Sequence, residues 1–318
     1  MAINSASLGM ILRNLLLSLT FLFCFSCTAS QPAETTQSKS ELIQHTVMSE
    51  GHPMAVWEKR AKDAKGVILF VHGRTWSGVP DFDLQVEGEN LSLMDGLVEK
   101  GYTTYAVDLR GYGATPRDET EWLSPTKAAL DINYVLEWIS EENGGQKVHL
   151  FGWSMGSTSS LLATTKDDSH IATLTIFGFW MDLDQTIPED KPGMAPAKII
   201  NTAEAAASDF ITPGSISKKA IDTYVEMALK ADPVKVDWRR MNEFHQIDPS
   251  VISVPVLLLQ GEFDPIAPPD VQAKLFTRLK TGNKSWIVVA GGDHAAFMET
   301  PRDYFIQSLA NFLDQFPQ

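Results

Sequence analysis

The chain alternates between short apolar runs and longer amphipathic stretches, and this alternation predicts strands and helices in turn. Runs rich in β-branched residues predict strands at 43–48, 54–59, 67–72, 103–107, 147–151, 172–178, 255–260 and 285–290. Patterns with the helical period predict helices at 86–100, 125–142, 155–166, 270–280 and 302–315. The runs VILFV at 67–71 and VLLL at 256–259 are continuously apolar, as is typical of parallel strands covered on both faces. The sequence therefore predicts an α/β fold, with a mostly parallel eight-stranded sheet flanked by helices.

One interval, residues 180–254, departs from this rhythm. It contains helical patterns at 195–209 and 215–231 but no buried strand pattern. Connections within a compact α/β domain usually have ~2–6 residues, so an interval of this length indicates an insertion with its own structure. We expect a helical cap over the active site at 180–254, inserted into a core made of residues 42–179 and 255–318.

The N-terminal residues differ in composition from the rest of the chain. Residues 1–27 contain a single charge, Arg13, followed by an apolar run at 15–25. A bilayer span needs ~20 apolar residues, so this run fits a secretory signal segment better than a membrane helix. Residues 28–41 are polar and lack an apolar period, which predicts a flexible tether.

The end of the signal segment resembles that of a bacterial lipoprotein, in which a cysteine after a small residue is lipidated. Cys27 follows Ser26 and would become the acylated N-terminus of the mature chain. The alternative is ordinary signal cleavage near Ala29 or Ser30. Both alternatives predict export. Lipidation would give a membrane-anchored lipoprotein that faces the periplasm, whereas ordinary cleavage would give a periplasmic or secreted protein.

Composition removes several other classes of function. The formal net charge is −14, which disfavours binding to nucleic acid, so contact with a membrane is expected only through the N-terminal anchor. The two cysteines, at positions 24 and 27, both lie in the signal segment, which leaves no disulfide, zinc–thiolate site or thiol nucleophile downstream. Because no phosphate-binding glycine loop or metal-ligand spacing appears, we expect no cofactor and no metal. No pattern predicts an oligomeric state.

The pentapeptide GWSMG at 152–156 matches the G-x-S-x-G pattern of a serine nucleophile. It follows the apolar run at 148–151 and precedes a helical pattern, and this strand–turn–helix context is the one that a nucleophile elbow requires. The turn would present Ser154 at a helix N-terminus, where developing negative charge is stabilised. The alternative is a serine that only caps a helix between two packing glycines.

A serine hydroxyl needs a base, and a histidine base needs a carboxylate to hold its tautomer. Of seven histidines, His294 in GGDHA at 291–295 lies between the last predicted strand and the last helix, where it can reach over the sheet edge. Asp264 follows the preceding strand and is the favoured carboxylate. The other acids considered are Asp293, Glu262 and Asp270. Among the other histidines we expect His149 in the core and His72 holding a loop, with His245 a weaker candidate for substrate contact.

The order Ser154, Asp264, His294 is that of an α/β-hydrolase triad. Residues 66–316 resemble α/β hydrolases of the lysophospholipase, monoacylglycerol lipase and serine aminopeptidase group. The resemblance is carried by VILFVHG at 67–73, DLRGYG at 108–113 and G-x-x-D-x-x-x-P at 261–268. It implies the α/β-hydrolase fold but no particular substrate.

The same fold implies where an oxyanion would be stabilised. One donor is expected to be the N–H of Met155, and the second the N–H of Arg74 or, alternatively, of Thr75. The Arg74 side chain either faces solvent or binds a polar part of the substrate.

Aromatic and apolar residues near the strand ends predict a largely apolar pocket for a small-molecule ester. The expected substrate wall consists of Trp76, Trp153, Trp180 and Met181. The function expected is a serine-dependent carboxylic ester hydrolase acting on a partly apolar ester or lactone at the cell envelope, one version being a detoxifying esterase. The alternatives are a lipase or lysophospholipase, a serine peptidase, and a catalytically silent binding lipoprotein.

Overall fold

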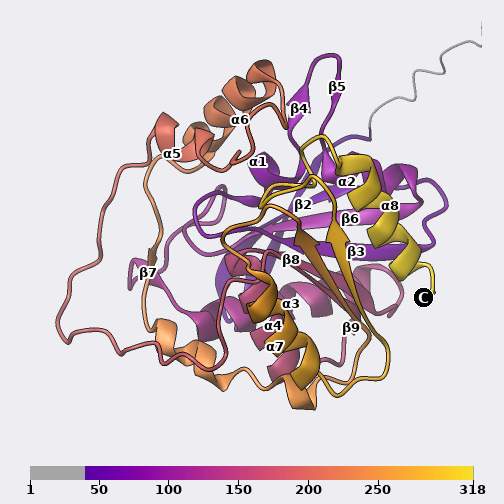
Figure 1. The fold of residues 1–318 in the computed structure, drawn as a ribbon. Coiled ribbons are helices and arrows are strands. Elements are labelled where there is room, and N and C mark those ends of the chain that lie inside the picture. Colours follow the sequence, from indigo (N-terminus) through magenta and orange to yellow (C-terminus); the bar gives the residue numbers. More distant parts are fainter. Residues whose placement is uncertain (1–39, 318) are drawn as a thin grey trace, which may run out of the picture. The chain divides into compact units, whose positions relative to one another are not determined.

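The computed structural model describes residues 40–317, which lie within one compact unit of the chain (Figure 1). The predicted signal segment 1–27, with Cys27, and all of the tether except residues 40 and 41 lie outside the described residues. No helix in the described part is long and apolar enough to cross a membrane.

The eight predicted strands form one sheet in the order β1-β2-β6-β3-β8-β9-β11-β12. β1 and β2 form an antiparallel hairpin, β2 is antiparallel to β6, and every other pair is parallel, which confirms the predicted mostly parallel sheet. The strands are β1 (Ile43–Ser49), β2 (His52–Lys59), β3 (Gly66–Val71), β6 (Tyr102–Asp108), β8 (Val148–Trp153), β9 (Ile171–Phe177), β11 (Val256–Gly261) and β12 (Lys284–Val289).

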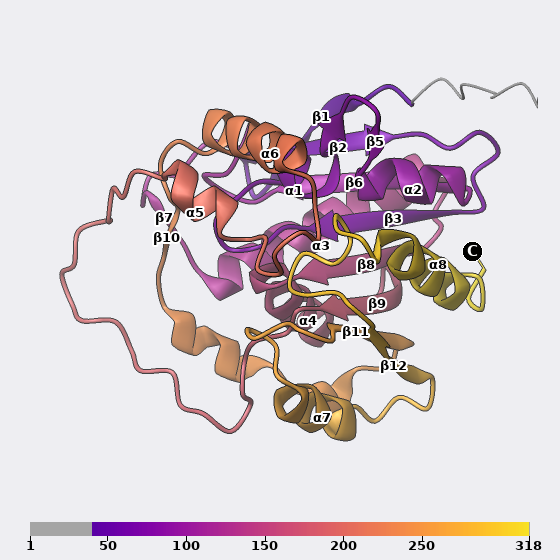
Figure 2. The same cartoon turned by 45° about the horizontal axis from the view of Figure 1, so that its top comes forward.

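The sheet has a hydrophobic core on each face, and its central strand β3, GVILFV, is buried at every position. In β3, Val67, Leu69 and Val71 belong to one core, while Ile68 and Phe70 belong to the other. The first core includes α3 (Pro125–Glu142), α4 (Met155–Lys166) and α7 (Pro269–Arg278). The second includes α1 (Gly78–Phe82), α2 (Leu93–Glu99) and α8 (Arg302–Leu313), so helices cover both faces (Figure 2).

Two predicted helices are shorter than expected. The stretch 86–100 is helical only in α2, because its first residues form a hairpin of β4 (Gln85–Val86) and β5 (Glu89–Asn90). The stretch 195–209 is helical only in α5 (Ala203–Ala207), since Ile200 pairs with Val234 in an isolated β-bridge. In both places chain pairing replaces the local helical preference.

Residues 180–254, called the inserted segment below, connect β9 to β11. They contain α5, α6 (Lys218–Ala231), β10 (Asp237–Trp238) and the 3-10 helices η1 (Met241–Gln246) and η2 (Pro249–Val251). β10 pairs in parallel with β7 (Trp122–Leu123).

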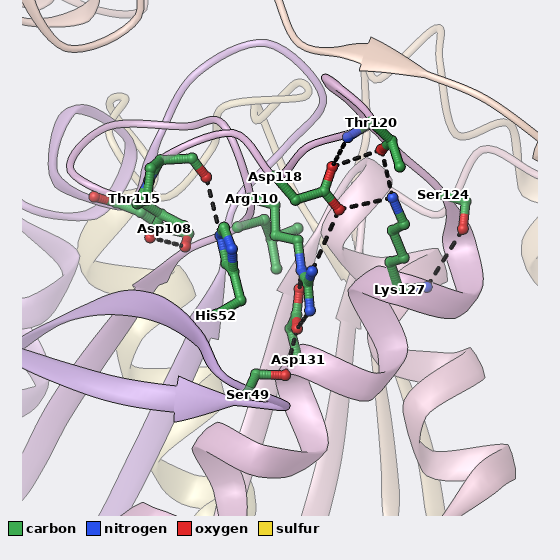
Figure 3. Close-up of polar contacts among 12 residues, drawn as sticks. Ser49, His52, Asp108, Arg110, Thr115, Asp118, Thr120, Ser124, Lys127 and Asp131 are labelled. Atoms are coloured by element: carbon green, nitrogen blue, oxygen red, sulfur yellow. Dashed lines mark hydrogen bonds and ion pairs between the residues drawn. The ribbon is translucent and has the colours of Figure 1, made fainter.

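The DLRGYG turn after β6 is anchored by charge (Figure 3). Arg110 forms two hydrogen bonds of 2.8 Å with Asp131, whose carboxylate also accepts a 2.5 Å bond from the Ser49 hydroxyl. Arg110 also lies 3.3 Å from Asp118. These bonds join the β1–β2 hairpin and α3 to the turn, which is therefore held from two sides.

Candidate active site

Ser154 lies at the junction of β8 and α4, with φ 56° and ψ −119°. This conformation is strained for a residue with a side chain, and it places the serine in a sharp turn between strand and helix. The turn is tight because Gly156 packs on β3: a Cβ there would lie 2.2 Å from the carbonyl oxygen of Val71. A larger residue at position 156 would push Ser154 away from the sheet edge.

His294 and Asp264 lie on the loops that follow β12 and β11. The imidazole Nδ1 of His294 is 2.8 Å from Asp264 Oδ2, and both side chains are buried. Asp264 Oδ1 accepts bonds from the N–H groups of Ile266 at 2.9 Å and Ala267 at 3.2 Å, so the carboxylate is fixed at both oxygens. The remaining ring nitrogen of His294, Nε2, is left to exchange a proton with another group.

Ser154 and His294 line one cavity of about 330 Å³. No hydrogen bond joins their side chains within residues 40–317, although contacts of this kind often tighten only when substrate binds. Gly178 provides the space for the imidazole, since a Cβ on this residue would lie 2.7 Å from His294 Cε1. The indole N–H of Trp153, the last residue of β8, donates a 2.7 Å bond to the carbonyl oxygen of His294 and so holds the histidine loop against the sheet.

Asp293, the acid next to His294 in the sequence, bonds backbone N–H groups and not the imidazole. Its Oδ2 accepts from the N–H of Thr212 at 2.6 Å, and its Oδ1 accepts from that of Ala295 at 3.0 Å. The carboxylate thus ties the histidine loop to the inserted segment, and Asp264 is the acid in contact with the imidazole.

The two predicted oxyanion donors approach Ser154 from different elements. Met155 is the first residue of α4, where the backbone N–H has no partner within the helix. Arg74 follows Gly73, at which a Cβ would lie 3.6 Å from Ser154 Cβ. Both Met155 and Arg74 line the cavity, so an oxygen next to Ser154 could receive N–H groups from both sides.

His72 supports the Arg74 loop. Burial lowers the pKa of His72 to about 4, so the ring is neutral at neutral pH. Its Nδ1 lies 2.8 Å from the carbonyl oxygen of Gly73, and its Nε2 accepts from the N–H of Leu109 at 3.1 Å. This pattern fixes the tautomer with the proton on Nδ1, which donates to Gly73.

The predicted substrate wall is only partly at the cavity. Trp76, Trp153 and Trp180 line it. Met181 lies outside it, buried in the core and beside a separate hollow with Phe244 and Ile247, because the chain turns the next side chain after Trp180 inward. His245 lies beside that second hollow as well, and its Nε2 accepts from the N–H of Ile187.

Two acids near the cavity, the buried Asp81 and the partly buried Asp209, belong to no sequence motif. Asp81 and Asp209 both line it, and the Tyr224 hydroxyl lies 2.9 Å from Asp81 Oδ1 and 3.3 Å from Asp209 Oδ2. Burial raises the pKa of Asp209 to about 6, while the nearby His294 opposes this shift. Burial raises the pKa of the Asp81 carboxyl well above its usual range, and the proximity of Asp209 adds to the effect. No group of three or more His, Cys, Asp or Glu within the described residues is arranged to hold a metal ion.

The parallel sheet, the strained serine turn and the histidine and acid loops at the same sheet edge define an α/β hydrolase. The chain belongs to the serine aminopeptidase S33 family, whose sequence model matches residues 62–301.

Curated relatives are distant. A serine hydrolase of Mus musculus, BPHL, is 31% identical over 127 residues, which span 38% of this chain and 38% of the mouse protein. The pimeloyl-[acyl-carrier protein] methyl ester esterase of Aeromonas salmonicida is 22% identical over 248 residues, covering 68% of this chain and 89% of that enzyme.

Solved structures share the fold. A serine hydrolase involved in carbazole degradation superposes with a TM-score of 0.63 at 16% identity, over 86% of this chain and all of the other. An esterase from Exiguobacterium antarcticum superposes with a TM-score of 0.59 at 17% identity, again over 86% of this chain and all of the other.

Proposed function

We propose that the protein is a serine-dependent carboxylic ester hydrolase. The observation that carries this proposal is that Ser154 and His294 line one cavity, while Asp264 lies 2.8 Å from His294 Nδ1. The esterases among the relatives and fold neighbours support the same reaction class.

In the proposed reaction Ser154 Oγ attacks the ester carbonyl while His294 Nε2 accepts its proton. Asp264 stabilises the resulting imidazolium and holds its tautomer. The carbonyl oxygen becomes an oxyanion that receives the N–H groups of Met155 and Arg74, each worth roughly 3 kcal/mol in the transition state. His294 then returns the proton to the leaving alcohol, and water hydrolyses the acyl-enzyme by the same route in reverse.

Cavity size and lining favour a small or medium-sized, partly apolar ester or lactone. About 330 Å³ is at the lower end of the ~300–1,000 Å³ typical of ligand pockets. Three indoles form much of its wall, whereas Arg74 and Asp209 provide charged groups. A detoxifying role toward such an ester is one form of this proposal.

A panel of p-nitrophenyl esters from acetate to palmitate, with a lactone and an aminoacyl amide, tests the substrate class. We expect kcat/KM to be highest for short and medium acyl chains and to fall at least about tenfold for palmitate, because the acyl chain exceeds the cavity. A maximum at palmitate would favour the lipase alternative, and cleavage of the amide alone would favour a peptidase. Absence of both turnover and fluorophosphonate labelling would favour a binding protein.

We further propose that the enzyme works at the cell envelope, attached through Cys27. In cells that process lipoproteins, a Cys27→Ser substitution should move the protein from the membrane fraction to the soluble fraction, because the acyl anchor is lost. Ser26→Ala, which keeps a small residue before the cysteine, is the matched control and should remain in the membrane fraction. Wild-type protein that is already soluble would contradict the anchor.

A further inference from the structure

The loop that carries the proposed Arg74 donor is linked to the inserted segment by two direct hydrogen bonds and by two more that pass through an intervening side chain. This loop, residues 73–77, connects β3 to α1 and is called the oxyanion loop here. The inference below rests on the proposed function, because the loop has a catalytic meaning only if Ser154 generates an oxyanion beside it.

Two contacts are direct. The indole N–H of Trp76 donates a 2.8 Å bond to Asp209 Oδ2, and the backbone N–H of Ser77 donates a 2.8 Å bond to Asp232 Oδ2. The other oxygen of Asp232 accepts from the N–H of Gly113 at 2.8 Å. Asp232 thus joins the end of the oxyanion loop to the DLRGYG turn, from its position at the C-terminus of α6.

A third contact passes through Tyr112. The indole N–H of Trp238, in β10, donates a 2.7 Å bond to the Tyr112 hydroxyl oxygen, and that hydroxyl donates to the carbonyl oxygen of Arg74. Since a phenol can accept one bond and donate another, the indole fixes the direction in which Tyr112 points its proton.

A fourth contact passes through Asp81. Its Oδ2 accepts a long bond, 3.4 Å, from the N–H of Gly73, and its Oδ1 lies 2.9 Å from the Tyr224 hydroxyl of α6. Tyr224 has one phenolic proton for Asp81 and Asp209, so only one of these acids can receive it at a time. Burial raises the pKa of both carboxyls, and the proximity of Asp209 adds to the rise at Asp81.

The third contact, together with His72, acts on the two peptide groups that matter for an oxyanion, and the other three hold the ends of the same loop. The carbonyl of Gly73 and the N–H of Arg74 belong to one planar peptide unit, as do the carbonyl of Arg74 and the N–H of Thr75. His72 holds the first carbonyl and Tyr112 holds the second. Within the described residues neither N–H has a hydrogen-bond acceptor, although both residues line the cavity beside Ser154. Fixing the carbonyls therefore aims the two N–H groups.

We propose that the inserted segment positions the oxyanion loop, with Tyr224, Asp232 and Trp238 as positioning residues. The segment then contributes to the chemical step as well as to covering the substrate. The N–H donors stabilise charge only if they are held in place before the reaction, because reorientation would cost part of what they gain. In that step the Ser154 Oγ–carbon bond forms, the π pair of the carbonyl moves to oxygen, and the proton of the serine passes to His294.

Tyr224→Phe and Trp238→Phe in the full chain remove two different links while keeping an aromatic ring. Neither residue lines the cavity, so ground-state binding should be spared. We expect each variant to lower kcat at least about fivefold with KM changed less than about threefold, the pattern of an interaction made in the transition state. The Ki of a trifluoromethyl ketone, whose adduct with Ser154 carries the same oxyanion, should rise in parallel with the loss in kcat/KM. Tyr304→Phe, on an exposed residue of α8, is the matched control and should match the wild type.

Substitutions of Asp81, which links the oxyanion loop to Tyr224, provide a second and independent measurement. Asp81→Asn keeps a neutral group that can accept from Gly73, whereas Asp81→Leu does not, so the asparagine variant should retain at least about fivefold more kcat than the leucine variant. Equal losses in the two would show that the bond from Gly73 to Asp81 does not position the loop. A rise in KM with kcat unchanged in Tyr224→Phe and Trp238→Phe, or wild-type kinetics in whichever of them folds, would overturn the positioning role. Ser154→Ala distinguishes failure of the positioning role from failure of the proposed function. If this variant stayed active, the proposed function itself would be wrong.

Discussion

Replacing Ser154 by alanine is expected to lower kcat for ester hydrolysis by at least about 10⁴-fold, because the hydroxyl that forms the proposed acyl-enzyme is removed. KM should change little, since the cavity walls remain. Labelling by a fluorophosphonate should be lost in the same variant. Both are measured on purified protein with a short p-nitrophenyl ester and with gel fluorescence.

Ser159→Ala is the matched control for this experiment. Ser159 lies in the same helix, and its hydroxyl is buried without a hydrogen-bond partner within the described residues. Removing it should leave kcat within about twofold, because no hydrogen bond is lost. Retention of activity and labelling in Ser154→Ala, with the fold intact, would show that the nucleophile lies elsewhere.

Asp264→Asn is expected to lower kcat by about 10⁴-fold at neutral pH, because an amide can hold the imidazole in the wrong tautomer and cannot stabilise its charged form. The reason is specific to this acid: it is the carboxylate 2.8 Å from His294 Nδ1. The change is nearly isosteric, so the thermal midpoint should be affected far less than the rate.

Asp293→Asn distinguishes this role from that of the adjacent acid. Asp293 accepts backbone N–H groups from Thr212 and Ala295 and does not contact the imidazole of His294. We expect it to cost less than about tenfold in kcat, through a loosened histidine loop. A larger loss in Asp293→Asn than in Asp264→Asn would reverse the assignment of the two acids.

The regular elements were predictable because their signals are local. Strands β3 and β11 contain continuous apolar runs. Helix α3 has the bounds predicted for it, Pro125–Glu142, because Ser124 caps its first turn and Pro125 fits the first helical position. Likewise the two glycines and the serine of GWSMG predict the strand–turn–helix geometry of this segment.

Elsewhere the local signal pointed the wrong way. The alanine-rich stretch at 195–209 favours a helix, but Ile200 is paired with Val234 across the inserted segment. Met181 follows Trp180 and is equally apolar, and only the packing of the chain decides that the tryptophan lines the cavity while the methionine enters the core. A side chain's hydrophobicity gives its preference for burial, but not the cavity or core that it faces.

The sequence by itself determined the α/β-hydrolase fold, the family and the serine, histidine and acid expected to share one sheet edge, because strand ends in a parallel sheet place such loops together. Only the tertiary structure decided which acid contacts His294, and that the oxyanion loop is held by Tyr224, Asp232 and Trp238. The contacts of the oxyanion loop with the inserted segment join residues more than a hundred positions apart, such as Ser77 and Asp232. Hydrogen bonds between such distant residues leave no periodic pattern in the sequence. They depend on where the whole inserted segment packs, and not on the residues next to them in the chain.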